Sequence, residues 1–370
     1  MHTFGIITMD RDAEKEYITE LGKRAPFHQF ICHVFSPKDI LPNKSTINGY
    51  VFDSTNNDWK ESEFPLPNIL YDRCFYKNEQ EMKRYSPIIN WLKQRKDACF
   101  LGYGLPNKFI MYDCLKHNQL LAPYLPPTKQ VISASQVLKQ LSIDYPIILK
   151  PVFGSQGRGI YVLQKALDGI QIKTVKNNQL IEKTLTISQT EKLISKMISL
   201  HKYLFQPFLK LQTTEKRPYD IRVFLQKDGK GNWVERGKGI RMGKGNYPIS
   251  NLASGGVCLP FEKWLATFQK ERATFIATEI QELIQSLPSM LETIFHPFFE
   301  IGIDISIDQK GAIWILEINS KPGRNVLFHL YPEMKDKLYD APFQYGNHLL
   351  TLSSGGQENC EEKSISNRTI

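Results

Sequence analysis

Three oxygen-bearing side chains near the end of the chain have the spacing of a metal site. Asp304 lies in a strictly alternating stretch from Ile301 to Asp308, with isoleucines on one face and polar residues on the other. Glu317 and Asn319 lie two residues apart in the next apolar stretch, so their side chains share a strand face. Mg²⁺ prefers such oxygens together with phosphate and water. The pattern predicts Mg²⁺ with a nucleotide; a solvated acidic strand face is the simpler alternative.

The loop between these two stretches decides whether the carboxylates can share an ion. Directly opposite residues of antiparallel strands share a face. An even loop, 309–310 or 309–312, would keep Asp304 on the face of Glu317. A three-residue loop would instead set Ile303 opposite Glu317 and turn Asp304 away, because a slip of one residue reverses every side chain. An odd loop is therefore compatible with a metal site only if a bulge restores the alternation.

A lysine and a glycine-rich loop in the middle of the chain could bind phosphates. Lys150 follows three aliphatic residues in a predicted strand, where a buried ammonium is costly unless an anion compensates it. A second strand follows the loop, so neither the dinucleotide fingerprint nor the P-loop fits. Backbone N–H groups of such a loop can still contact phosphates, although an ordinary hairpin turn would have the same pattern. The loop consists of Gly154, Ser155, Gln156, Gly157, Arg158 and Gly159.

Basic residues gather between Lys210 and Lys244, where ten Lys or Arg accompany four acids, in a chain of net charge +9. Arg222 and Arg241 lie in two predicted strands, 219–226 and 233–241, and a guanidinium offers phosphate or carboxylate oxygens a planar pair of donors. Such a field attracts nucleotides, acidic substrates or nucleic acid. No aromatic platform or helix-turn-helix pattern accompanies it, so we do not expect nucleic-acid binding.

Length and composition predict a globular protein of two or three domains, at ~150 residues each. No apolar run approaches the ~20 residues of a membrane span, and the N-terminus lacks the pattern of an export signal, so we expect a cytoplasmic protein. The six cysteines form no CxxC pair and the eight histidines no HxH or HExxH motif. We therefore expect neither a disulfide framework nor a transition-metal site.

The elements that would position these residues follow from periodicity and turn signals. We expect a small α/β domain at the N-terminus, where Tyr71-Asp72-Arg73 ends a strand. This segment could contact substrate, although a surface salt bridge is the simpler role. Capping boxes at 133–136 and 188–191 predict helix starts, and an apolar stripe over 275–294 predicts a helix against the sheet. The tail from Ser353 is polar and predicted to be disordered. The N-terminal domain should contain strands 4–9, 30–35, 50–53, 69–72 and 98–101, helices 12–23 and 87–96, and a loop at 59–67.

The order of these signals from about 106 to 330 resembles the ATP-grasp superfamily. Within it, the segments 220–226, 233–241 and 314–320, and Asn251 with Gly255-Gly256, look most like the YheC/YheD family of endospore coat-associated proteins. This resemblance implies an α/β (α+β) protein with an ATP-grasp fold. The implied parts are a small α/β domain (1–105), an ATP-grasp N-terminal subdomain with the glycine loop (106–205), a C-terminal subdomain with the metal site (206–335), and a C-terminal extension (336–370).

The resemblance also implies roles for individual residues. Gln206 stands where many members carry Glu, and its amide could still contact adenine. The implied metal ligands for two Mg²⁺ ions are Asp304, Glu317 and Asn319. The implied nucleotide contacts are Lys108, Lys150, Gly154, Ser155, Gln156, Gly157, Gly159, Gln206, Phe208, Leu209 and Asp220. The implied catalytic residues are Arg222, Arg241 and Asn251.

The activity implied by the resemblance is an ATP- and Mg²⁺-dependent ligase. A substrate carboxylate would attack the γ-phosphate of ATP, and an amine would capture the acyl phosphate. Two alternatives remain: a kinase that phosphorylates a hydroxyl, and a coat or assembly protein that binds ATP without turnover. The expected partners are ATP and an acid and an amine that no motif specifies, together with spore coat proteins, and the expected location includes the spore coat.

Overall fold

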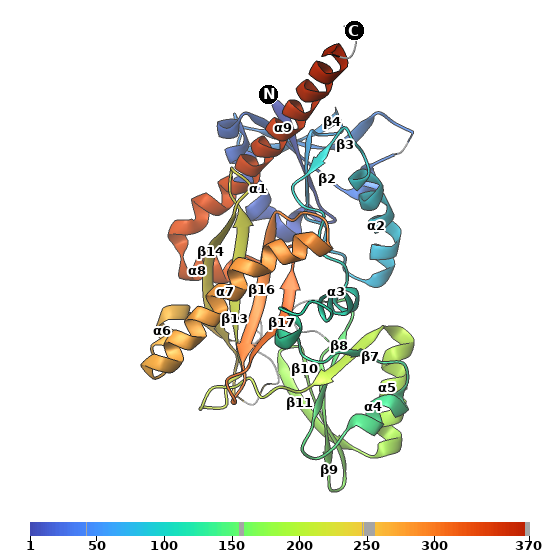
Figure 1. The fold of residues 1–370 in the computed structure, drawn as a ribbon. Helices are drawn as coiled ribbons and strands as arrows, with labels where there is room; N and C mark the ends of the chain where they lie inside the picture. The colour runs from blue at the N-terminus through green and yellow to red at the C-terminus, as the bar shows by residue number, and fades with distance from the viewer. Residues whose placement is uncertain (42, 155–158, 246, 248–255, 367–370) are drawn as a thin grey trace.

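The computed structural model describes residues 1–41, 43–154, 159–245, 247 and 256–366, with side chains to residue 353. Three β-sheets organise the chain, and we call them the N-terminal, middle and C-terminal sheets (Figure 1). The middle sheet lies at one end of the molecule, and the other two lie together with a long C-terminal helix. No described helix is long and apolar enough to cross a membrane.

The N-terminal sheet has the strand order β4-β3-β2-β1-β5-β6, in which β2, β1, β5 and β6 are parallel. The carboxyl ends of these parallel strands meet at one edge, which is where ligands bind in open α/β sheets. Asp72 ends β5 at this edge. The strands are β1 (His2–Ile7), β2 (Phe30–Phe35), β3 (Thr46–Asp53), β4 (Asp58–Pro65), β5 (Ile69–Asp72) and β6 (Cys99–Phe100). The helices are η1 (Arg11–Glu14), α1 (Lys15–Arg24), η2 (Ala25–His28), η3 (Pro37–Asp39) and α2 (Glu79–Lys93).

Two predictions in this domain are wrong. The predicted loop 59–67 is largely strand β4, which pairs with β3 along its whole length and forms a charged edge of the sheet. Its polar sequence has the composition of a loop, but charged side chains are also common on edge strands. Helix α2 begins well before the predicted start, because Asn78 caps it through a hydrogen bond from the Glu81 N–H.

The middle sheet has the order β11-β10-β9-β8-β12-β7. Its helices α4 and α5 pack on one face, in a core drawn only from residues 131–205. Ser133 caps α4 as predicted, whereas Thr186 with Gln189 caps α5 two residues before the predicted box. The elements, with the linking helices α3 and η4, are α3 (Lys108–Leu115), η4 (Ala122–Tyr124), β7 (Lys129–Gln130), α4 (Ala134–Gln140), β8 (Ile147–Pro151), β9 (Tyr161–Ala166), β10 (Gly169–Lys176), β11 (Gln179–Leu185), α5 (Ile187–Leu200) and β12 (Tyr203–Pro207).

The C-terminal sheet has the order β15-β14-β13-β16-β17 and is antiparallel. Helix α7 covers its apolar face through the predicted stripe, except that Phe275 and Ile294 are exposed. Helix α8 covers the other face so closely that a Cβ at Gly239 would lie 2.3 Å from Leu330 Cδ1. The elements are β13 (Tyr219–Lys227), β14 (Trp233–Met242), β15 (Val257–Pro260), α6 (Phe261–Leu265), α7 (Lys270–Ile294), β16 (Glu300–Ile307), β17 (Ile313–Asn319), α8 (Asn325–Leu330), η6 (Pro332–Met334) and α9 (Lys335–Ser366).

The long helix α9 returns to the N-terminal sheet. Its residues Phe343 and Tyr345 join the core that contains Phe4 and Phe30, so the first and last parts of the chain share one core. The helix extends to Ser366, although the polar tail from 353 predicts disorder. Packing of the first turns supplies the nucleus that an isolated helix would lack, and Glu, Gln and Lys are good helix formers.

Candidate nucleotide and metal site

The hairpin of β16 and β17 brings the predicted metal ligands onto one face. Its loop has three residues, 309–311, closed by hydrogen bonds between Asp308 and Ala312 and between Asp308 and Gly311. Next to the loop, the strands pair with Ile305 opposite Ile315. If this register continued, Asp304 would point to the face opposite Glu317. The register then shifts by one residue, and Asp304 lies directly opposite Glu317. A bulge at Leu316 thus compensates for the odd loop, which is the second of the two predicted routes.

The resulting face is the one that α7 does not cover. Asp304 is buried, whereas Glu317 and Asn319 are half-buried. The described residues contain no group of three or more His, Cys, Asp and Glu side chains that could hold a metal by themselves. Two carboxylates and one amide oxygen do fit Mg²⁺ bound together with a nucleotide, because Mg²⁺ takes the rest of its shell from phosphate and water.

Two arginines hold Asp304 in place. Arg222 donates to both Asp304 oxygens, with Nη2 2.9 Å from Oδ2, and Arg241 Nη2 lies 2.8 Å from Oδ2. Arg241 Nε also lies 2.6 Å from Asp220 Oδ1. Burial alone would raise the pKa of Asp304, but the Arg222 and Arg241 charges outweigh it and lower the pKa to about 2. Asp304 therefore stays ionised, and both guanidiniums have fixed orientations.

Two lysines approach this face from the elements next to the glycine loop. Lys108 Nζ lies 3.3 Å from Glu317 Oε1 and donates to the Gly154 carbonyl at 3.0 Å. Lys150 lies in β8. Its burial and, to a smaller extent, the nearby Lys108 charge lower the pKa of Lys150 to about 8, although the Glu317 and Asp304 charges act in the opposite direction. Within the described ranges, no side chain or backbone group forms a hydrogen bond or ion pair with the Lys150 ammonium. An incoming anion would supply that partner.

The remaining predicted nucleotide contacts lie in or just after β12, at the two ends of the glycine loop, or outside the described residues. Gln206 lies on the sheet face of Lys150, since Lys150 pairs with Leu204, but its amide donates to Thr128 Oγ1 at 2.7 Å. Phe208 N–H donates to the Pro146 carbonyl at 2.8 Å, and the Leu209 carbonyl accepts from Leu211 N–H at 2.9 Å. Gly154 and Gly159 have positive φ values. Ser155, Gln156, Gly157 and Asn251 lie outside the described residues.

A buried ionic network beside the site was not predicted. Arg73, predicted to form a surface salt bridge, is fully buried and contacts Glu14 at 2.6 Å and Glu300 at 2.8 Å. Arg324 lies 2.7 Å from Glu300 and donates to Tyr71 Oη at 2.6 Å. Two arginines and two glutamates make the network neutral. Glu300 could have been found by extending the polar alternation of Asp304 back along its strand.

The turn after Asn319 connects the predicted metal face to the N-terminal sheet. Ser320 Oγ accepts from Leu105 N–H at 2.9 Å. Lys321 Nζ contacts Asp72 Oδ1 at 2.6 Å and the Cys74 carbonyl at 3.0 Å. These contacts attach the hairpin that carries the predicted metal ligands to the N-terminal sheet.

Comparisons with known proteins agree with this architecture. The sequence model of the YheC/D-like ATP-grasp family matches residues 97–349, more than half of the chain. The chain belongs to this family. It is 34% identical over 354 residues to the endospore coat-associated protein YheC of Bacillus subtilis, covering 96% of this chain and 98% of the relative. This confirms the predicted family and the α/β ATP-grasp fold.

Two more distant similarities are consistent with that assignment. The tetrahydromethanopterin:alpha-L-glutamate ligase of Methanocaldococcus jannaschii is 25% identical, over 92% of this chain and 98% of that ligase. The solved D-alanine-D-alanine ligase of Coxiella burnetii superposes with a TM-score of 0.51 at 9% identity, over 99% of this chain and all of that one. The structural similarity supports the fold alone.

Proposed function

We propose that the protein is an ATP- and Mg²⁺-dependent ligase that joins a carboxylate to an amine. The main support is the register that sets Asp304 opposite Glu317 on a face reached by Lys108 and Lys150. A similar relative and a similar structure bear the names of ligases for glutamate and for D-alanine. The ammonium of Lys150, which has no partner among the described residues and lies near the Lys108 charge, suits a multiply charged nucleotide.

In the proposed mechanism, the chain's own residues position charge. Mg²⁺ held by Asp304, Glu317 and Asn319 would neutralise phosphate oxygens during transfer. Lys108 and Lys150 would bind the phosphates of ATP. A substrate carboxylate oxygen forms a bond to the γ-phosphorus as the bond to ADP breaks. The amine nitrogen then attacks the acyl carbon and phosphate leaves.

Arg222 and Arg241 would stabilise the charge that develops on the transferred phosphoryl group. Their contacts with Asp304 and Asp220 fix both guanidiniums before substrate arrives, so little reorganisation is needed during the reaction. Burial of Arg241 would lower its pKa, but Asp220 and Asp304 raise the pKa above its ordinary value. Arg241 therefore remains charged throughout.

The test is a screen of ADP release by the purified protein with Mg-ATP, supplied with amino acids, short peptides and spore-wall peptides singly and in pairs. The proposal predicts release that needs both an acid and an amine, and a product whose mass is their sum minus water. Release with a hydroxyl acceptor and a phosphorylated product would indicate a kinase. ATP binding without any release across the screen would favour a non-catalytic coat protein.

We also propose that the protein acts in formation of the spore coat or envelope, made in the cytoplasm and then retained at the coat. The support is the similarity to a relative named as endospore coat-associated. Immunodetection in fractionated spores checks this. Recovery in the coat extract is expected, whereas confinement to vegetative lysates would contradict the location.

A further inference from the structure

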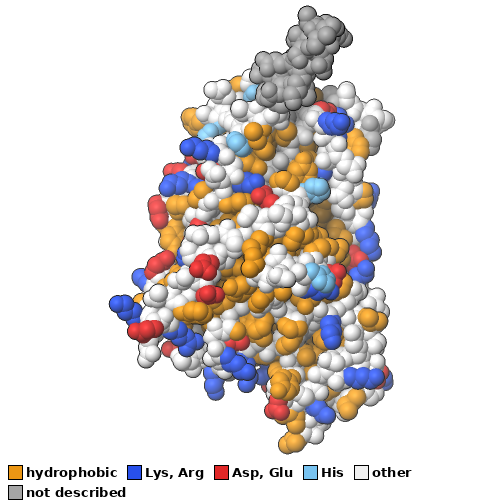
Figure 2. Space-filling view, viewed as in Figure 1, with side chains coloured by type: hydrophobic (Ala, Val, Ile, Leu, Met, Phe, Trp, Pro, Cys, Tyr) orange, Lys and Arg blue, Asp and Glu red, His pale blue; other side chains and the backbone are white. Residues whose placement is uncertain are grey.

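A crevice of about 490 Å³ opens between α3 and the β7 edge of the middle sheet. The helix contributes Phe109, Tyr112 and Lys116, and the strand and the segment after it contribute Lys129, Gln130 and Ile132. Hydrophobic and basic side chains are both visible around the place of α3 and β7 on this side of the molecule (Figure 2).

The backbone of β7 is open on the crevice side. β7 is the edge strand, and β12 is its partner within the sheet. Val131 N–H donates to the Tyr203 carbonyl at 2.8 Å, and Gln130 pairs with Leu204 without exchanging hydrogen bonds with it. Gln130 therefore directs its N–H and C=O away from β12, because these groups alternate between the two edges of a strand. None of the described residues hydrogen-bonds to either group.

The crevice also has side chains suited to a peptide. Phe109 and Tyr112 are half-buried, and Ile132 leaves 80% of its surface exposed. Lys129 is exposed and has no counter-ion in the described part of the chain, whereas Lys116 pairs with Asp113. One positive charge beside an apolar floor favours a partner that alternates acidic and apolar side chains.

We propose that this crevice binds an extended acidic peptide segment, which adds a strand to β7. Main-chain hydrogen bonds with Gln130 would give affinity, and the apolar floor with Lys129 would give selectivity. An unpaired edge strand is a ready template for such an addition. The inference does not rest on the proposed ligase activity, although Thr128, which lines the crevice, accepts a hydrogen bond from Gln206.

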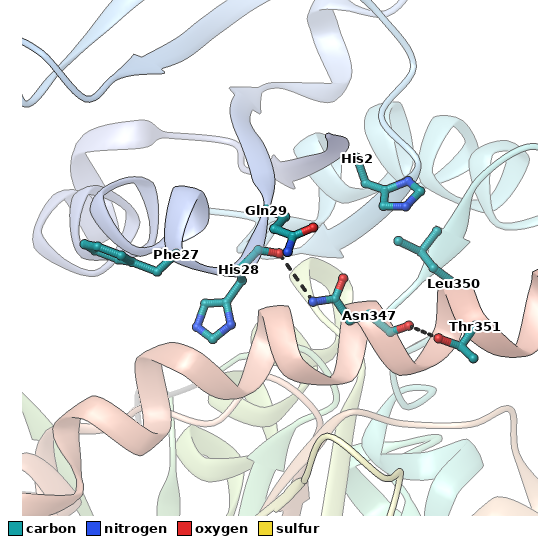
Figure 3. Close-up of a pocket in the computed structure, with 7 residues that line it drawn as sticks. All are labelled: His2, Phe27, His28, Gln29, Asn347, Leu350 and Thr351. Carbon is teal, nitrogen blue, oxygen red and sulfur yellow. Dashed lines mark hydrogen bonds between the residues drawn. The ribbon is translucent and has the colours of Figure 1, made fainter.

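A second cavity, at the N-terminal sheet, lacks these features. It measures about 510 Å³ and lies between η2, the start of β1 and α9 (Figure 3). Asn347 Nδ2 donates to the His28 carbonyl across it, and Thr351 Oγ1 donates to the Asn347 carbonyl. The strand at its wall, β1, is paired on both sides, so no strand edge is open there.

The proposal can be tested with the full chain and a fluorescein-labelled peptide of four Glu-Val repeats, followed by fluorescence anisotropy. Saturable binding is expected, with about tenfold weaker binding of a Lys-Val peptide. A peptide with alternate amides N-methylated should not bind. Ile132→Asp and Lys129→Glu should each weaken binding about tenfold, whereas the matched control Leu167→Asp, at the fully exposed tip of the β9–β10 turn, should not.

Saturating Mg-ADP should leave the peptide affinity nearly unchanged. Competitive displacement by Mg-ADP would overturn the proposal, because the crevice would then belong to the nucleotide site. Absence of saturable binding, equal binding of the acidic and basic peptides, or insensitivity to Ile132→Asp would each overturn it as well.

Discussion

The middle sheet and the rest of the molecule differ in the parts of the chain that form their hydrophobic cores. The core of the middle sheet draws only on residues 131–205, so this part is self-contained. The N-terminal and C-terminal sheets, which we call the body, share a core that includes Phe299 and α9, and the Glu300 network joins them. Lys150 lies on the first part, and the metal face lies on the second. The candidate site therefore lies between the middle sheet, which has a core of its own, and the body, which the Glu300 network holds together.

The largest expected effect comes from removing the buried ionic network that joins the two sheets of the body. Glu300→Ala leaves Arg73 and Arg324 buried with too little negative charge and should destabilise the body by ~3–5 kcal/mol. All five tryptophans lie in the body, so tryptophan fluorescence in urea follows this part selectively. The control Asp97→Ala removes an exposed ion pair with Arg95 in the body and should cost less than ~1 kcal/mol. Equal midpoints for Glu300→Ala and the wild type would mean that the network does not join the sheets.

A cavity in the middle sheet should affect only that part. Leu149→Ala removes a fully buried side chain from its core and should destabilise it by ~2–5 kcal/mol. Amide exchange should accelerate across β8 to β12, while the tryptophan midpoint stays at its wild-type value. A matching shift of the tryptophan midpoint would show that the two parts unfold together.

The affinity for ATP, which we expect to bind between the middle sheet and the body, should depend on Lys150. Lys150→Ala should weaken ATP binding by ~1.5–3 kcal/mol in a calorimetric titration, because a charge-assisted contact is lost. Lys183→Ala, on an exposed position of β11, serves as the control and should bind like the wild type. Unchanged ATP affinity in Lys150→Ala would contradict the assignment of this lysine.

A smaller effect should appear with pH. The pKa of Lys150 is about 8 in the free protein, so the side chain is charged below pH 8 and loses its proton above it. ATP favours the charged form, and its affinity should therefore fall about twofold as the pH rises from 7 to 8 and about fivefold from 8 to 9. Lys150→Arg should remove this dependence, because a guanidinium stays charged. A wild-type affinity that is equal at pH 8 and pH 9 would count against the shift.

The sequence predicted the local parts of the site better than the long-range ones. Alternation along 301–308 predicts both the strand and the face of Asp304, because period 2 follows from strand geometry alone. The bulge at Leu316 could be stated only as a condition, since its position depends on packing of the finished sheet. Arg73 looked like a surface residue because its partner Glu300 is 227 residues away in the chain. Strand β4 was missed for a similar reason, as its polar sequence becomes a strand only by pairing with β3.

The most direct test of the central claim is the Mg²⁺ dependence of ATP binding by the wild type and by Glu317→Ala. The account predicts that Mg²⁺ strengthens ATP binding in the wild type and that this gain disappears in Glu317→Ala, because the variant loses one of the two carboxylates that face each other across β16 and β17. Thermal unfolding of both proteins without nucleotide verifies that the variant is folded. A folded Glu317→Ala protein that keeps the full Mg²⁺-dependent gain would contradict the metal site.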